Sequence, residues 1–414
     1  MKKLMALLLS AVMLTSLVIG FASCDLFGGP PVVGLICLHG ESSTYDKNFI
    51  DAFEAACKAK GLSKSQYRIV VDVPESNKCY EEAANLADMG CKAIFADSFG
   101  HEQHMIKAAN EFKDVHFFHA TGTQAKVKKL NNYHNAFASI YEGRYLAGYA
   151  AGLTLNTMKN KAVNNVFKVG YVGAWTYAEV MSGYTSWFLG LKAALDNGYS
   201  ATMEVQFTGS WYDEQGEKTA AENLITRGAV LVSQHADSMG APTACDNKGV
   251  PNVSYNGSTG KNTLVAYSKI NWEPYFKKMI DNALNGTEVP TDYCGSFTDD
   301  SVQYEIGPKA PSGAAATLER IESELKAGTR KVFDTSKFTV NGNRVTSYEA
   351  DINGDYEPDT GINVIKTANG VSYFDESNAS EFRSAPYFDL EIDGITLLNR
   401  VYEADEDGNP IIIT

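Results

Sequence analysis

The sequence lacks the short motifs that identify several large classes of enzyme. It has no G-x-S-x-G nucleophile turn, no G-x-x-x-x-G-K-[ST] phosphate loop and no H-E-x-x-H metal helix. Positive charge is also scarce, because 50 Asp and Glu outnumber 36 Lys and Arg and give a formal net charge of −14. Nucleic acids and anionic lipids are bound through basic patches, so this balance argues against both partners. We expect no catalytic residue and no cofactor.

Clustered metal ligands are absent as well. The seven cysteines show no C-x2-C spacing, so neither a zinc site nor a redox pair is indicated. Six of them remain apart from Cys24, and an even number in an exported chain permits disulfides without fixing their pairing. The segment 351–359 (DINGDYEPD) alternates oxygen-bearing side chains as calcium loops do. It lacks the sixth-position Gly and the twelfth-position Glu of an EF-hand, and we interpret it as turns, with no metal.

A single apolar run approaches the length of a membrane span, and it stands at the start of the chain. A basic start precedes the stretch 4–21, and Ala22-Ser23-Cys24 follows it, which is the pattern of a secretory signal peptide. A cysteine directly after the cleavage point accepts lipid in lipoproteins. We therefore expect removal of 1–23, acylation of Cys24, and a flexible tether over 24–31. The alternative is an uncleaved membrane-spanning helix.

Strand and helix patterns alternate from residue 32 onward. Continuous apolar strands are predicted near 32–38, 67–73, 92–96 and 115–119, with helices between them. The alternation restarts with a small-residue-rich helix at 141–157 and strands at 168–173, 201–207, 229–234 and 253–255. The pattern predicts two α/β units, each with a doubly wound parallel sheet. After about residue 330, Asn-Gly and Asp-Gly turns separate short strand-like pieces, which indicates a β-rich extension.

Polar and aromatic residues stand where the predicted strands end, which is where ligands bind in such sheets. Large exposed rings at these positions suit a flat, hydrogen-bonding ligand that stacks on them, and a sugar would fit the same description. The same loops supply carboxylates and amides that could form hydrogen bonds with the polar edge of the ligand. The candidate binding residues are Tyr45, Asp46, Asp97, Trp175, Trp211, His235, Asp237, Ser238, Asn256 and Trp272. Trp187 is predicted to be core, and Asp213 to cap a helix.

Five segments carry a combined signal that none carries alone: 141–152 (YEGRYLAGYAAG), 169–173 (VGYVG), 209–221 (GSWYDEQGEKTAA), 233–242 (SQHADSMGAP) and 271–275 (NWEPY). Together they resemble the basic membrane protein (BMP) family of lipoproteins, over about 32–307. The resemblance implies a type I periplasmic-binding-protein-like fold with two lobes joined by a hinge. It also implies a nucleoside or purine receptor that serves an ABC permease.

The expected organisation follows from this resemblance and the alternation. The first lobe is placed at 32–136 with 257–290 returning to it, the second at 137–256 with 291–330, and the extension at 331–414. The chain departs from nucleoside-binding members at His39, Asn256 and Asn271, where they carry charged residues. A free purine base therefore becomes at least as plausible as a nucleoside.

We predict a lipid-anchored, monomeric solute-binding protein that closes on a purine nucleoside or base and delivers it to an ABC importer. It is expected at the cell membrane, facing the periplasm or the exterior. A sugar-binding or sensory receptor lipoprotein and a nucleoside hydrolase are the alternatives, the last lacking any matched catalytic constellation.

Overall fold

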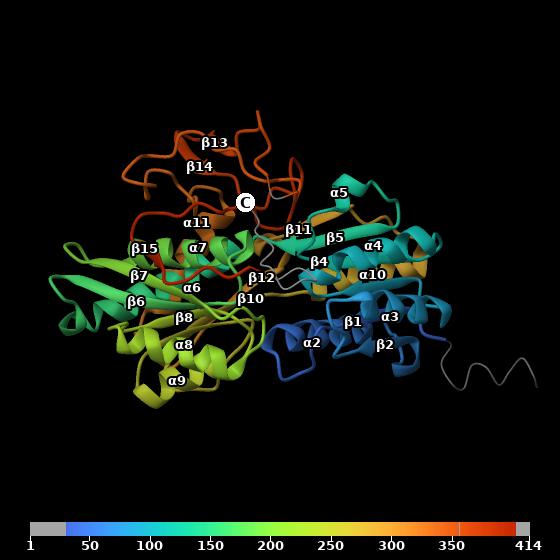
Figure 1. Cartoon of the computed structure of the whole chain (residues 1–414), viewed down its shortest axis with the longest axis horizontal. Helices are drawn as coiled ribbons and strands as arrows, with labels where there is room; N and C mark the ends of the chain where they lie inside the picture. Colours follow the sequence, from blue (N-terminus) through green and yellow to red (C-terminus); the bar gives the residue numbers. More distant parts are fainter. Residues whose placement is uncertain (1–29, 356, 403–414) are drawn as a thin grey trace, which may run out of the picture.

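The computed structural model describes residues 30–355 and 357–402, and it contains two α/β lobes side by side with a C-terminal segment across them (Figure 1). The predicted signal peptide, Cys24 and most of the tether lie outside the described residues. Within the described part, no helix has the length and apolar character needed to cross a membrane.

The first lobe is built on a six-stranded parallel sheet in the order β11-β5-β4-β3-β1-β2. Its strands are β1 (Val33–Ile36), β2 (Tyr67–Val70), β3 (Ala93–Ala96), β4 (His116–Ala120), β5 (Tyr133–Ala138) and β11 (Asp292–Gly295). Its helices are α2 (Thr44–Ala59), α3 (Asn77–Asp88), α4 (Glu102–Glu111), α5 (Ala125–Lys128) and α10 (Glu273–Asn285).

Successive residues of these strands enter different cores, because side chains alternate between the two faces of a sheet. Leu35 and Phe95 pack with α2 and α10, whereas Ile36 and Ile94 pack with α3 and α4. Both faces are therefore buried, which explains why the strands are continuously apolar in sequence.

The second lobe has a seven-stranded sheet in the order β12-β10-β9-β8-β6-β7-β15, in which β12 runs antiparallel to β10 and the other neighbours are parallel. Its strands are β6 (Val166–Gly173), β7 (Ser200–Phe207), β8 (Val232–His235), β9 (Asn252–Tyr255), β10 (Leu264–Ile270), β12 (Val302–Ile306) and β15 (Ile395–Leu397). Its helices are α6 (Ile140–Asn156), α7 (Ala178–Ala194), α8 (Glu214–Thr226), α9 (Gly240–Lys248) and α11 (Ala314–Lys326). Asp213 caps α8 by accepting from the Gly216 N–H at 2.9 Å, and Trp187 is fully buried, both as predicted.

Helices α6 and α7 pack so closely that glycine is required at their contact. A Cβ added to Gly148 would lie 1.9 Å from the carbonyl oxygen of Trp187, and one added to Gly190 would lie 2.0 Å from that of Tyr145. The small residues of α6 therefore bring the helix against its neighbour. This packing fixes α6 at the centre of the lobe.

The chain crosses between the lobes later than expected. Strand β10, inside the segment 257–290 that we assigned to the first lobe, pairs with β9 in the second sheet. Strand β11, inside the segment 291–330 assigned to the second lobe, pairs instead with β5 in the first. The apolar pattern could not assign these strands to a lobe, because a buried strand has the same sequence pattern in either sheet.

The C-terminal segment 331–402, which we call the extension, contains little regular structure. Strands β13 (Ile365–Ala368) and β14 (Val371–Phe374) form a hairpin whose turn residues Asn369 and Gly370 both have positive φ. Strand β15 joins the edge of the second sheet beside β7. The rest of the described extension is loops and turns, so its strand content is lower than the turn-rich sequence suggested. The two-lobed α/β fold itself is confirmed.

Candidate functional site: a cleft between the lobes

The carboxyl ends of the two parallel sheets face each other across a cleft, and two adjoining cavities lie there. The inner cavity measures about 20 Å³ and is lined by Leu38, Tyr45, Asp46, Ser98, Phe99, Thr121, Glu179, Trp211, His235 and Asp237. Each of these follows a strand end or begins the next helix, which is where α/β sheets bind ligands. The volume holds about one water molecule.

The outer cavity measures about 280 Å³ and shares Phe99, Thr121, Glu179 and Trp211 with the inner one. Its remaining wall comes from Thr123 of the first lobe, from the segment 176–181 at the start of α7, and from the extension. The extension supplies Asp351, Gly354, Pro358, Arg383, Ala385, Pro386, Tyr387, Asp389, Glu391 and Tyr402. The cleft is therefore enclosed by three parts of the chain.

Contacts across the cleft hold the lobes together. The Thr44 N–H and hydroxyl donate to the carbonyl oxygen of Asp237 at 2.9 and 3.1 Å. The Asn48 amide donates to the Ile270 carbonyl at 2.7 Å. The rings of Phe99 and Tyr177 lie 5.6 Å apart between centroids. This is a closed arrangement of the lobes.

Two carboxylates of the first lobe are held by the protein itself. Asp46 accepts from the His39 N–H at 2.7 Å and from the Ser43 hydroxyl at 2.5 Å. Asp97 accepts from the Leu38 N–H at 3.1 Å, and its carbonyl oxygen accepts from the Tyr45 hydroxyl at 2.7 Å. Burial raises the pKa of Asp97 well above its usual value, and the neighbouring Asp46 raises it further.

Two carboxyl groups of the second lobe have no hydrogen-bond donor among the described residues. They are Asp237 and Glu179, and both line the inner cavity. Burial raises the pKa of Glu179 to about 7 and that of Asp237 well above its usual value. Both carboxyl groups line the cavity, where they can accept from a donor of the ligand or, when protonated, donate to one of its acceptors.

Arg144 and His235 complete the polar side of the cleft. The Arg144 guanidinium lies 3.3 Å above the Tyr255 ring and donates to the Gln234 carbonyl at 2.9 Å. His235 Nε2 lies 3.6 Å from Glu179 Oε1, and burial lowers the pKa of the imidazole well below its usual value. Arg144 adds to that lowering, so His235 is neutral and offers one donor and one acceptor.

The structure brings half of the predicted binding residues to the inner cavity: Tyr45, Asp46, Trp211, His235 and Asp237. Asp97 lies directly behind them through its contact with Tyr45. Trp175 lines neither cavity and stacks on Tyr177, at 6.3 Å between centroids.

Three predicted residues lie elsewhere. Trp272 is 2% exposed and stacks on Phe49 in the core of the first lobe, with centroids 4.4 Å apart. Ser238 is fully buried and ties its own loop, because its N–H donates to Glu217 and its hydroxyl accepts from Gly240. Asn256 sits in a turn with φ of 63° and lines a separate surface hollow beside α2. These three residues were predicted from their positions near strand ends. A side chain near a strand end need not face the cleft.

The sequence analysis missed Glu179, Tyr177 and Phe99, which line the cavities, and Arg144, which lies behind them against Tyr255. Phe99 and Tyr177 follow predicted strands, so the aromatic signal could have found them. Arg144 is buried in α6, and Glu179 lies in the first turn of α7. The extension residues carried no signal at all.

One group of possible metal ligands comes together among the described residues: Cys37, Asp46 and Asp97. Burial raises the pKa of the Cys37 thiol and of Asp97. Both groups therefore favour their protonated forms, which are poor metal ligands. The six described cysteines are free thiols, so no disulfide links them.

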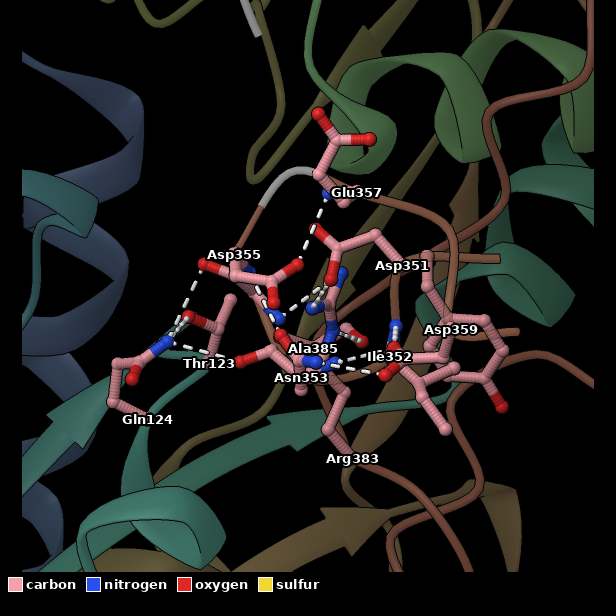
Figure 2. A network of polar contacts seen from close by, with 12 residues as sticks. Thr123, Gln124, Asp351, Ile352, Asn353, Asp355, Glu357, Asp359, Arg383 and Ala385 are labelled. Atoms are coloured by element: carbon pink, nitrogen blue, oxygen red, sulfur yellow. Dashed lines mark hydrogen bonds and ion pairs between the residues drawn. The ribbon is translucent and has the colours of Figure 1, made fainter. Parts of the chain in front are cut away.

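The loop 351–359 holds its oxygens with its own backbone (Figure 2). Asp359 accepts from the N–H groups of Ile352 and Asn353, and Asp351 accepts from that of Gly354. The Arg383 guanidinium lies 3.8 Å from Asp351, so a cation of the protein already balances this carboxylate. The turn interpretation accounts for these contacts.

The chain is similar to known proteins over most of its two lobes. A family model, Bmp, described as ABC transporter substrate-binding protein PnrA-like, matches residues 40–297, which is more than half of the chain. A purine-binding protein of Brucella abortus is 27% identical over 273 residues, 65% of this chain and 73% of the relative. A Haloferax volcanii protein named as a putative ABC transporter glucose-binding protein is 27% identical over 286 residues, 66% of this chain and 68% of the relative.

Solved structures share the fold at low sequence identity. An ABC transporter solute-binding protein from Conexibacter woesei superposes with a TM-score of 0.56 at 20% identity, covering 73% of this chain and 98% of that one. The type I periplasmic-binding-protein-like architecture is thereby confirmed. The family and the fold are those of substrate-binding proteins and not of enzymes.

Proposed function

Since this chain belongs to the Bmp family of PnrA-like ABC transporter substrate-binding proteins, we propose that it captures a purine nucleoside or base and delivers it to an ABC permease. The ligand binds between the lobes, which open to admit it and close around it. Lipid on Cys24 would hold the protein, as a monomer, at the outer face of the cell membrane.

The observation that carries the purine proposal is that aromatic rings and carboxyl groups line the same cavity. Phe99 and Trp211 come from different lobes and line both cavities, and they offer flat faces to a heteroaromatic ring. Asp237 and Glu179 offer acceptors to the N–H groups at its edge. The name of the Brucella relative is in keeping with this chemistry.

A sugar is the second candidate. Its hydroxyls could donate to the same carboxyls, and the name of the Haloferax relative favours such a ligand. The two candidates differ in what they need from the rings, because only a heteroaromatic ligand presents a π-face to each side. The apolar face of a pyranose can stack on one ring.

The test is calorimetric titration of the soluble body, residues 25–414, with adenine, hypoxanthine, adenosine, inosine, ribose and glucose. We expect at least one purine compound to bind with a Kd of about 1 μM or below, about −8 kcal/mol. Binding of glucose with silence of all four purine compounds would contradict the proposal. Thermal stabilisation by the same ligand provides an independent readout.

A further inference from the structure

We infer that the extension forms a second compartment of the ligand site, which holds the hydroxylated part of a nucleoside and thereby selects nucleosides over free bases. The inference rests on the proposed function, and it decides between two ligands that the sequence left open. The family match ends at residue 297, so this wall is an addition to the matched region.

The extension is firmly attached to the second lobe. Strand β15 continues the second sheet, with Ile395 paired to Met203. The Asn399 amide exchanges two hydrogen bonds with the backbone of Phe207, at 2.8 and 2.9 Å. The Thr176 N–H donates to the Val401 carbonyl at 2.8 Å, at the rim of the outer cavity.

The extension also reaches the first lobe, and Figure 1 shows it lying across both lobes. Ser384 donates through its N–H and hydroxyl to Asp292 at 2.8 and 2.5 Å, and the Asn135 amide donates to Ser384 at 3.0 Å. All three residues are buried. Figure 2 shows a second contact, in which the Gln124 amide donates to the Asn353 carbonyl at 3.0 Å. The wall is therefore held from both sides of the cleft.

The size of the outer cavity exceeds what a bare base requires. Its volume of about 280 Å³ is nearly twice the roughly 150 Å³ of an engineered cavity that binds benzene. The same cavity is lined by Phe99 and Trp211 and by the extension residues Tyr387 and Asp389, so a base at the two rings can share it with a second group at the extension. A ribose attached to the base would be such a group.

The polar groups of the extension's wall suit the hydroxyls of a ribose. Asp351, Asp389 and Glu391 give this wall three carboxyl groups, of which Glu391 is paired with the Arg400 guanidinium at 2.6 Å. The Arg383 guanidinium faces Asp351. Ribose hydroxyls can donate to the oxygens of these carboxyl groups.

The first experiment compares matched pairs on the soluble body, residues 25–414: adenosine against adenine, and inosine against hypoxanthine. We expect the nucleoside of at least one pair to bind about tenfold or more tightly, as one charge-assisted hydrogen bond would give. Hydrogen exchange of the backbone over 383–391 should slow with the nucleoside and stay unchanged with the base. Equal affinity for base and nucleoside, with no protection of 383–391 by either, would overturn the inference.

A pair of isosteric variants tests the wall directly. Asp389→Asn keeps an acceptor for the Tyr348 hydroxyl, which donates to Asp389 at 2.6 Å, but removes the carboxylate charge. It should weaken the nucleoside about tenfold and leave the base unchanged. Asp375→Asn is the matched control, because Asp375 is an extension carboxyl that accepts from Asn378 and lines neither cavity. Equal loss in both variants, or in base and nucleoside alike, would contradict the inference.

Failure of the proposed function gives a different result from failure of this inference. One outcome is that glucose or ribose binds and protects 383–391 from exchange, while no purine compound binds. The purine proposal then fails, and the compartment stands as a site for hydroxyls. If purines bind and 383–391 is never protected, the proposed function stands and the compartment fails.

Discussion

The backbone N–H of Thr44, at the start of α2 in the first lobe, donates to the carbonyl oxygen of Asp237, after β8 in the second. The Asp237 carboxyl lines the inner cavity, so the residue whose carbonyl accepts the hydrogen bond between the lobes also faces the proposed ligand. Opening the cleft breaks this hydrogen bond, and closing it restores the bond beside the site. A ligand that satisfies Asp237 thus favours the closed state through its differential contacts.

Asp237→Asn should weaken ligand binding by about tenfold to a hundredfold, because an amide replaces a buried carboxyl group that hydrogen-bonds to the ligand. The backbone carbonyl that Thr44 uses is retained, so the lobes can still close. Asp246→Asn serves as the control, since Asp246 lies on α9 and outside the cleft cavities. Calorimetric titration gives the measurement. Unchanged affinity in Asp237→Asn would place the ligand elsewhere.

Two tryptophans should respond in opposite ways to substitution. Trp211→Ala should reduce affinity by about 1–3 kcal/mol through loss of a stacking face. Trp272→Phe should leave affinity unchanged and lower the free energy of unfolding, because the indole packs against Phe49 and Phe95 in the core. Titration and denaturant unfolding of both variants separate the two effects. A loss of affinity confined to Trp272→Phe would reverse the assignment.

Glu179 should make folding stability depend on pH. Burial raises its pKa in the folded protein from 4.5 to about 7. The folded state therefore holds a proton that the unfolded state releases, and stability is lost as pH rises from about 4.5 to about 7. Relative to the native chain, Glu179→Gln should gain up to about 3 kcal/mol of unfolding free energy over this window. Denaturant unfolding at about pH 5 and about pH 8 measures the difference, and an equal difference at both pH values would contradict the assignment.

Gly148→Ala should destabilise the second lobe. The added Cβ would lie 1.9 Å from the Trp187 carbonyl oxygen, so α6 and α7 must separate, which costs about 1–3 kcal/mol or more. Gly257→Ala is the matched control, because a Cβ added there would meet nothing within 4 Å and its φ is not positive. Thermal unfolding should show a lower Tm for Gly148→Ala alone. A similar Tm for both variants would contradict the close packing of the two helices.

Cys24→Ala should abolish membrane attachment, because it removes the thiol that is predicted to carry lipid. The variant should remain uncleaved or appear as a freely soluble product. Fractionation of cells and mass spectrometry of the N-terminus make the test. Processing and membrane retention identical to the native chain would disprove the predicted anchor.

The sequence alone was sufficient to predict the two-lobed α/β fold. Strands buried on both faces give continuous apolar runs, and amphipathic helices repeat apolar residues every three to four positions, so the two are distinguishable in short windows. The sequence also identified the strand-end loops, and through them Tyr45, Asp46, Trp211, His235 and Asp237. Only the tertiary structure could place β10 in the second sheet and β11 in the first, since the apolar pattern of a strand does not specify which sheet it joins.

The tertiary structure also separated Trp211 in the cleft from Trp272 in the core, because both follow a strand and differ only in the direction of the side chain. Only the tertiary structure showed that the extension lines the outer cavity. Hydrogen bonds such as that between Ser384 and Asp292 join residues far apart in sequence, and no local pattern encodes such a contact.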